Sequence, residues 1–200
     1  MLYLTEPERL GDLLPDEPRY RTDQLHGWLY ANPVLDIDAM TNLPAPLRDA
    51  LRDQLWPFTV DIEQRADDGS TIKWLFRCSD GAPIEAVLMG YRNRTTLCIS
   101  SQVGCAMGCT FCATGQFGFE RHLDAGEIVA QVAYANAFLR ETPLPHSPER
   151  VTNVVFMGMG EPLANYRNTV ESIRRMVDVM GLSGRSITVS TVGFVPGMRT

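Results

Sequence analysis

Three stretches with different hydrophobic patterns follow one another along the chain. In residues 1–56 apolar residues recur three and four positions apart, as on one face of a helix, and Leu47 and Leu51 belong to such a stripe. In residues 57–94 apolar and polar residues alternate, which is typical of strands with one buried face. We therefore predict a small N-terminal helical domain followed by an antiparallel β-meander.

Residues 95–200 alternate between short apolar runs and helical patterns, so the fold class is α/β. Strands are predicted at 95–100, 151–157 and 187–192, and helices at 124–139 and 165–180. The run at 151–157 is apolar enough for a strand covered on both faces. Strands that alternate with helices imply a parallel sheet with right-handed crossovers.

The first helix of this region carries a clear start signal. Asp124 is followed three residues later by Glu127, which is the pattern of a capping box. In the N-terminal stretch, Thr22 is the predicted cap of a helix that carries Leu25 and Trp28. A turn is predicted at residues 67–70 within the meander.

Composition narrows the class of protein. The chain has 200 residues, 44% hydrophobic and 21% charged, as in ordinary soluble proteins. Its net charge of −6 argues against nucleic-acid binding through a uniformly basic surface. No apolar run reaches the roughly 18 residues of a membrane helix, and the first residues lack a secretory signal pattern, so a cytoplasmic location is expected. Five cysteines in that compartment suggest metal or redox chemistry more than structural disulfides.

Three of these cysteines lie close together in a glycine-rich stretch. Cys105, Cys109 and Cys112 have the spacing C-x3-C-x2-C, with Phe111 directly before the third. Structural zinc normally has four protein ligands, whereas a four-iron cluster held by three cysteines leaves one iron free for a substrate or cofactor. The alternatives are zinc with His122 as a fourth ligand, and three cysteines that merely pack in a turn.

The spacing C-x3-C-x-aromatic-C resembles the cluster motif of radical S-adenosylmethionine (SAM) enzymes. Residues 96–105 (TLCISSQVGC) and 157–162 (MGMGEP) narrow the resemblance to the RlmN family, which methylates C2 of adenine in ribosomal and transfer RNA. The resemblance extends over nearly all 200 residues. It implies a partial (β/α) barrel of the radical SAM type over 95–200, incomplete in this chain, and an RNA-binding role for 1–56.

The resemblance also implies two cofactors. A [4Fe–4S] cluster would be held by the three clustered cysteines, and SAM would contact Gly160, Glu161 and Ser190. In that interpretation Glu161 accepts hydrogen bonds from the ammonium group of SAM. From the residues alone, Gly160 and Glu161 equally fit a strand-to-helix turn, and Ser190 is only a polar residue in a strand.

Two further residues match positions with catalytic roles in the family. Glu85 matches the proton acceptor, and Cys98 matches the cysteine that forms a transient disulfide with a methyl-carrying cysteine and so releases the RNA. From the residues alone, alternation places Glu85 on the solvent face of its strand, and Cys98 fits a buried core cysteine. Cys78 matches no such role and is expected to pack.

The resemblance thus implies methylation of C2 of adenine in 23S rRNA and tRNA through a methyl-cysteine, with a flavodoxin-like electron donor and a monomeric enzyme. The alternatives are an adenine-C8 rRNA methyltransferase of the same superfamily and a non-catalytic, metal-bearing RNA-binding module. No cysteine follows Cys112 to carry the methyl group, and three barrel strands leave an open sheet edge. The chain is therefore expected to be the N-terminal part of a longer protein.

Overall fold

The computed structural model describes residues 1–66 and 68–199. Its N-terminal segment consists of short helices: η1 (Pro7–Leu13), α1 (Arg19–His26), the π-helical η2 (Gly27–Ala31), η3 (Ile37–Ala39), α2 (Ala45–Leu51) and η4 (Arg52–Gln54). The helical prediction is confirmed. The predicted cap Thr22 is wrong, because α1 begins three residues earlier, after the extended residue Pro18. Proline has no N–H to leave unpaired, so it suits a helix start.

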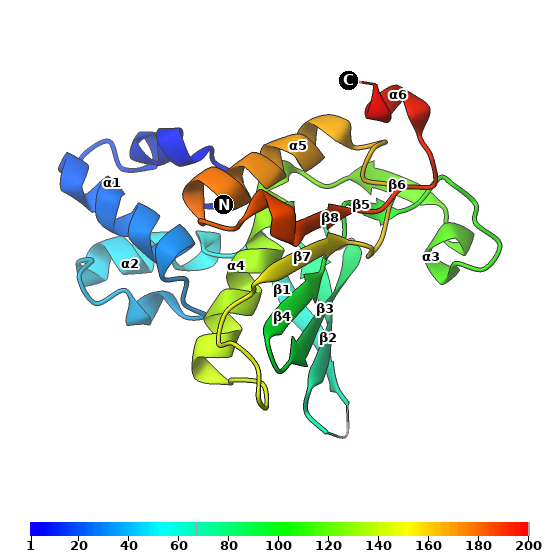
Figure 1. Ribbon diagram of the computed structural model, residues 1–200. Helices are drawn as coiled ribbons and strands as arrows, with labels where there is room; N and C mark the ends of the chain where they lie inside the picture. Colours follow the sequence, from blue (N-terminus) through cyan, green and yellow to red (C-terminus); the bar gives the residue numbers. More distant parts are fainter. Residues whose placement is uncertain (67, 200) are drawn as a thin grey trace.

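A six-stranded sheet in the order β1-β2-β3-β4-β7-β8 forms the centre of the molecule (Figure 1). Its strands are β1 (Phe58–Arg65), β2 (Thr71–Cys78), β3 (Pro83–Tyr91), β4 (Arg94–Cys98), β7 (Asn153–Phe156) and β8 (Ile187–Val189). The first four pair antiparallel, as predicted for the meander, and β4, β7 and β8 pair parallel. Meander and parallel part therefore form one open sheet, and the barrel is not closed.

One face of the sheet is covered by α4 (Ala125–Glu141), which lies between the strands and the N-terminal helices (Figure 1). Trp74 and Phe76 on β2 are fully buried, and the ring of Tyr134 on α4 packs against both, at centroid distances of 5.4 and 5.2 Å. Tyr134 also meets Trp56 from the N-terminal segment at 5.3 Å. A single apolar core thus joins the helical segment, the meander and the parallel strands.

The capping box at the start of α4 is confirmed: the Glu127 carboxylate accepts a hydrogen bond from the backbone N–H of Asp124 at 2.9 Å. The second long helix, α5 (Tyr166–Arg174), continues as the π-helical turn η5 (Arg175–Val179). The remaining elements are the 3-10 turn η6 (Gly184–Ser186) and the short helix α6 (Val195–Met198).

Several predicted details are corrected. Only alternate residues of β7 are buried, so this strand is covered on one face and not on both. β8 ends at Val189, three residues earlier than predicted. The predicted turn at 67–70 includes residue 67, which lies outside the described residues. In the described part of the chain no helix is long and apolar enough to cross a membrane.

Candidate active site

The three clustered cysteines lie on a loop that leaves and re-enters a small hairpin of β5 (Gln102–Gly104) and β6 (Phe119–His122). The backbone N–H of Cys105 donates to the carbonyl of Gly118 at 2.8 Å and closes the neck of the loop. Gly104 has φ +69°, and a Cβ there would lie 1.9 Å from the Gly118 oxygen. Only glycine fits this neck, because any side chain would force the two strands apart.

Within the loop, Cys105, Cys109 and Cys112 are free thiols and half-buried. The short helix α3 (Ala113–Gln116) follows the third cysteine. Among the described residues no three cysteine, histidine or acidic side chains converge as a metal site. The side chains of Phe111 and Phe117 are 90% and 85% exposed, so packing within this chain does not account for either phenylalanine.

The segment after β7 approaches the cysteine hairpin closely. Gly160 has φ +103°, and a Cβ there would lie 2.6 to 2.8 Å from atoms of Gln102. The Gln102 side chain accepts from the backbone N–H of Glu161 at 2.8 Å and meets Nδ1 of His122 at 2.9 Å. One glutamine therefore ties the predicted SAM-binding segment to the hairpin, and it occupies a ring nitrogen of the residue considered as a zinc ligand.

Glu161 itself is buried, at 2% exposure. One carboxylate oxygen accepts from the backbone N–H of Leu163 at 3.0 Å, and the other accepts from that of Val192 at 2.9 Å. The side chain thus links the segment after β7 to the segment after β8, and neither oxygen is without a donor. Ser190 follows the end of β8 and is exposed. Contact of these residues with SAM stays a prediction.

Glu85 and Cys98 lie on the face of the sheet that α4 leaves open. Cys98 pairs with Val87 on β3 and with Val155 on β7, and Glu85 lies two residues before Val87 on the same face. Such diagonal neighbours are about 7 to 8 Å apart. Lys73 on β2 forms an ion pair with Glu85, with 2.7 Å between Nζ and Oε1.

A cavity of about 550 Å³ lies between the open face and the cysteine loop. Its sheet wall includes Leu75 and Glu85, and its loop wall includes Gly104 and Phe117. Met159, next to Gly160, closes one side. The structure therefore brings Glu85, the cysteine loop and the segment after β7 around one space. Cys98 lies beside Glu85 on the sheet but does not line the cavity, and neither does Ser190. The loop borders the cavity through residues next to the cysteines, and the other predicted ligands are also outside the lining: Cys105, Cys109, Cys112, Gly160 and Glu161.

Two protein-family models match parts of this chain. Residues 99–198 match the family model of the radical SAM superfamily, and residues 13–56 match the ribosomal RNA large subunit methyltransferase N-terminal domain. The chain belongs to the RlmN family of radical SAM proteins.

Individual relatives agree with this family. The chain is 50% identical, over 92% of its length, to a protein of Salinispora tropica named probable dual-specificity RNA methyltransferase RlmN. It is 44% identical, over 98% of its length, to a protein of Bifidobacterium adolescentis with the same name. It covers 51% and 53% of these two proteins, so it spans about half the length of the curated relatives it matches.

A solved structure supports the fold in the same way. The crystal structure of a radical SAM methyltransferase from Sphaerobacter thermophilus superposes with a TM-score of 0.87 at 47% identity. The match covers 98% of this chain and 57% of that one. The partial radical SAM region predicted from the cysteine motif is therefore confirmed.

The thiols of this RlmN-family chain differ in their surroundings. Burial raises the pKa of the Cys98 thiol, and a hydrogen bond with the backbone of Met157 partly opposes the rise. Burial, together with the nearby Glu127 carboxylate, raises the pKa of Cys78 to about 12. Cys78 is only 3% exposed, so the prediction that it packs is confirmed. All five cysteines are free, so no disulfide involves Cys98 in this structure.

A partly buried charge network holds the hairpin in place. The Arg121 guanidinium on β6 donates to both oxygens of the buried Glu127, at 2.8 and 2.9 Å. It also donates to Asp80, in the turn after β2, at 2.5 Å, and it lowers the pKa of that carboxyl. Arg121 therefore fixes β6, and with it one end of the cysteine loop, to both α4 and the meander.

Sequence reasoning missed three residues of this site: Lys73, Gln102 and Arg121. Gln102 stands inside the segment that carries the family resemblance, three residues before Cys105, so its position was a signal. The partners of Lys73 and Arg121 depend on strand register, which the sequence pattern leaves open.

Proposed function

We propose that this chain is the part of an RlmN-type enzyme that binds the cluster and SAM, and that the enzyme methylates C2 of adenine in 23S rRNA and tRNA. The observation that carries the proposal is the shared cavity, since Glu85, the cysteine loop and the segment beside Gly160 all border it. The printed names of the relatives support the RNA substrate. Residues 1–56 would contribute to RNA binding.

The cluster fits the loop by the chemistry of its donors. Cys105, Cys109 and Cys112 are free thiols, and Gly108 and Gly118 give the loop two further residues at positive φ, so it can close around a bulky group. A [4Fe–4S] cluster held by these three cysteines would supply the electron for the reductive cleavage of SAM. SAM would lie against the segment at Gly160 and Glu161: the Glu161 carboxylate accepts one backbone hydrogen bond on each oxygen, and each oxygen keeps a lone pair that can accept from the ammonium group of SAM.

Glu85 has the position for proton transfer in this scheme. General-base catalysis needs a carboxylate within hydrogen-bond reach of the substrate, and Glu85 lines the cavity. Lys73 binds Oε1, which orients the carboxylate and leaves Oε2 to accept the proton from C2 of adenine. Cys98 would supply the thiol that attacks the sulfur of the protein cysteine carrying the RNA adduct, so that an S–S bond forms as the S–C bond to the RNA breaks and its electron pair stays with the RNA. Because the pKa of Cys98 is raised, this thiol must lose its proton in that step.

The first test is iron and acid-labile sulfide per chain after anaerobic reconstitution, with EPR of the reduced protein in the presence and absence of SAM. About four iron and four sulfide are expected, with a spectrum that changes when SAM is added. The activity to measure in this chain is the formation of 5′-deoxyadenosine from SAM. Dithionite replaces the expected flavodoxin-like electron donor in this assay.

Two variants make the test specific. Cys109→Ala removes a proposed ligand and is expected to abolish the SAM-dependent spectrum, whereas Cys98→Ala leaves all three proposed ligands and is expected to retain it. Zinc in place of iron, or a cluster whose spectrum ignores SAM, would contradict the proposal and favour the metal-bearing RNA-binding module. Sedimentation of the reconstituted chain checks the predicted monomer.

A further inference from the structure

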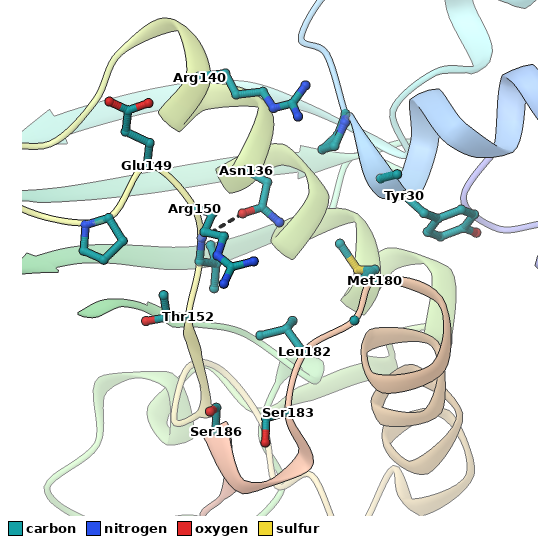
Figure 2. A pocket seen from close by; sticks show the side chains of 15 residues that line it. Tyr30, Asn136, Arg140, Glu149, Arg150, Thr152, Met180, Leu182, Ser183 and Ser186 are labelled. Atoms are coloured by element: carbon teal, nitrogen blue, oxygen red, sulfur yellow. Dashed lines mark hydrogen bonds between the residues drawn. The ribbon is translucent and has the colours of Figure 1, made fainter. Parts of the chain in front are cut away.

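A second cavity lies at the opposite edge of the parallel strands. It has a volume of about 800 Å³, and Val151, Thr152 and Ser186 line it at the points where β7 and β8 begin. The cysteine loop and Gly160 follow the carboxyl ends of β4 and β7, so the two cavities are separated by the length of the strands. The C-terminal part of α4, the segment after η5, the loop before β7 and the N-terminal segment around Tyr30 form the rest of the wall (Figure 2).

Two arginine side chains that have no carboxylate partner among the described residues line this cavity. Arg150 points into it and forms no ion pair with any described residue (Figure 2). Arg140 donates to Oδ1 of Asn32 at 2.6 Å but likewise has no carboxylate within ion-pair distance among the described residues. The Asn136 amide oxygen accepts from the N–H of Val151 at 2.8 Å, which leaves its NH2 group as a donor.

The surroundings of these donors favour an anion with an apolar part. Glu149 is the one acidic residue of the cavity lining, and its side chain is directed away from Arg150 (Figure 2). The hydroxyl groups of Ser183 and Ser186 lie at the lower wall (Figure 2). Met180 and Leu182 face the donors from the other side. In a chain with a net charge of −6, two guanidinium groups that have no carboxylate partner among the described residues thus line one cavity.

We propose that this cavity binds a nucleotide, with the phosphate against Arg140 and Arg150 and the nucleoside against Met180 and Leu182. The planar guanidinium group matches phosphate oxygens in a bidentate way, and the Asn136 amide is a further donor on the same side of the cavity. The hydroxyl groups of Ser183 and Ser186, at the lower wall, are then left for the ribose hydroxyls. The phosphate comes either from a free mononucleotide or from an RNA backbone. This site is separate from the proposed catalytic cavity and needs neither the cluster nor SAM.

The test is calorimetric titration of the cluster-free chain with AMP at low ionic strength. Binding is expected for AMP, competition for inorganic phosphate, and no comparable binding for adenosine, which lacks the phosphate. Arg150→Gln and Arg140→Gln are each expected to weaken AMP binding about tenfold or more, because each removes a charge-assisted hydrogen bond. Arg167→Gln is the matched control, since Arg167 is an exposed arginine on α5 outside the cavity.

A second titration with a short single-stranded oligoribonucleotide distinguishes the two sources. If the phosphate belongs to RNA, the oligonucleotide binds more tightly than AMP, and Arg150→Gln lowers both its affinity and the salt dependence of binding. If it belongs to a free nucleotide, AMP binds at least as tightly as the oligonucleotide.

The proposal is overturned if neither probe binds, or if Arg167→Gln weakens binding as much as the two cavity variants do. Circular dichroism of each variant checks that the exposed substitutions leave the fold intact. Because no cluster is present in these titrations, failed reconstitution would contradict the proposed function and leave this result unaffected.

Discussion

Strands β2 and β3 present two faces of opposite character. On the covered face, Trp74 and Phe76 are fully buried beneath α4. On the open face, Lys73 and Glu85 form an ion pair whose side chains are 42% and 40% exposed. Since side chains alternate along a strand, the same backbone provides stability on one side and reactive groups on the other. A register slip of one residue would exchange the two sets, so packing of the covered face fixes where Glu85 lies.

The largest expected effect is on the covered face. Trp74→Ala should lower the free energy of unfolding by about 3 to 5 kcal/mol, because it removes a large buried ring and leaves a cavity. Leu75→Ala, one residue away on the open face, should cost only about 1 kcal/mol, since Leu75 is half-buried. Urea denaturation measures both. Similar losses for the two variants would contradict the division into a covered and an open face.

The charge network under the cysteine hairpin comes next. Arg121→Met should cost about 3 kcal/mol, because it leaves the buried Glu127 without its counter-ion. Arg52→Met is the control: Arg52 pairs with Asp38 and Asp49 at exposed positions, where solvent screens the charges, so its replacement should change the free energy of unfolding far less than Arg121→Met does. The double variant Arg121→Met/Glu127→Leu should recover most of the lost free energy of unfolding, because no buried charge remains. The part that stays lost is the hydrogen bond between the Glu127 carboxylate and the N–H of Asp124 at the start of α4. An equal cost for Arg121 and Arg52 would mean that the network is not effectively buried.

The neck of the cysteine loop predicts a smaller effect. Gly104 and Gly81 both have positive φ, but a Cβ at Gly81 meets nothing within 4 Å, whereas one at Gly104 meets the Gly118 oxygen. Gly81→Ala should therefore cost about 1 kcal/mol from backbone strain alone. Gly104→Ala should cost about 2 kcal/mol or more and should also reduce cluster reconstitution. Thermal unfolding and iron content check both effects.

The reactivity of the thiols should distinguish the cysteine loop from the sheet in the unsubstituted chain. In the cluster-free chain, iodoacetamide should label the loop cysteines first, Cys98 more slowly and Cys78 last, as followed by peptide mass spectrometry. The raised pKa of Cys98 keeps its thiol protonated, so its labelling rate should still rise above pH 8.5, near the ordinary thiol pKa. Labelling of Cys98 as fast as the loop cysteines at neutral pH would contradict its raised pKa.

The Cys78 thiol makes a related prediction for folding. Its folded-state pKa of about 12 lies above the ordinary value, so its contribution to stability is complete below about pH 8.5 and is lost as the pH rises toward 12. Denaturation midpoints should fall over that range and should fall less in Cys78→Ala, once that variant's lower starting stability is taken into account.

Much of this arrangement could be predicted from local sequence patterns. Alternation placed Glu85 on the face opposite Ile84, and burial along β3 confirms it. The capping box at Asp124 depends on only four residues and is present as predicted. Each of these features rests on a short stretch of chain with a strong periodic or capping preference, so no distant contact is needed to establish it.

The rest depends on contacts between distant segments. β5 and β6 have only three and four residues, too few to show a hydrophobic period, so the hairpin was not predicted. The Lys73–Glu85 and Arg121–Glu127 pairs depend on strand register and on how α4 docks. The cysteine motif indicated a ligand set, but not that Glu85 borders the same cavity.

The place of β4 in the sheet has a consequence for how the molecule opens. β4 is paired on both sides, antiparallel with β3 and parallel with β7, and Leu97 at its centre is fully buried. Its amides should be among the slowest to exchange with deuterated solvent, whereas those of β8, paired on one side among the described strands, should exchange early. Cys98, at the end of β4, would then keep its position while the edge of the sheet opens and closes.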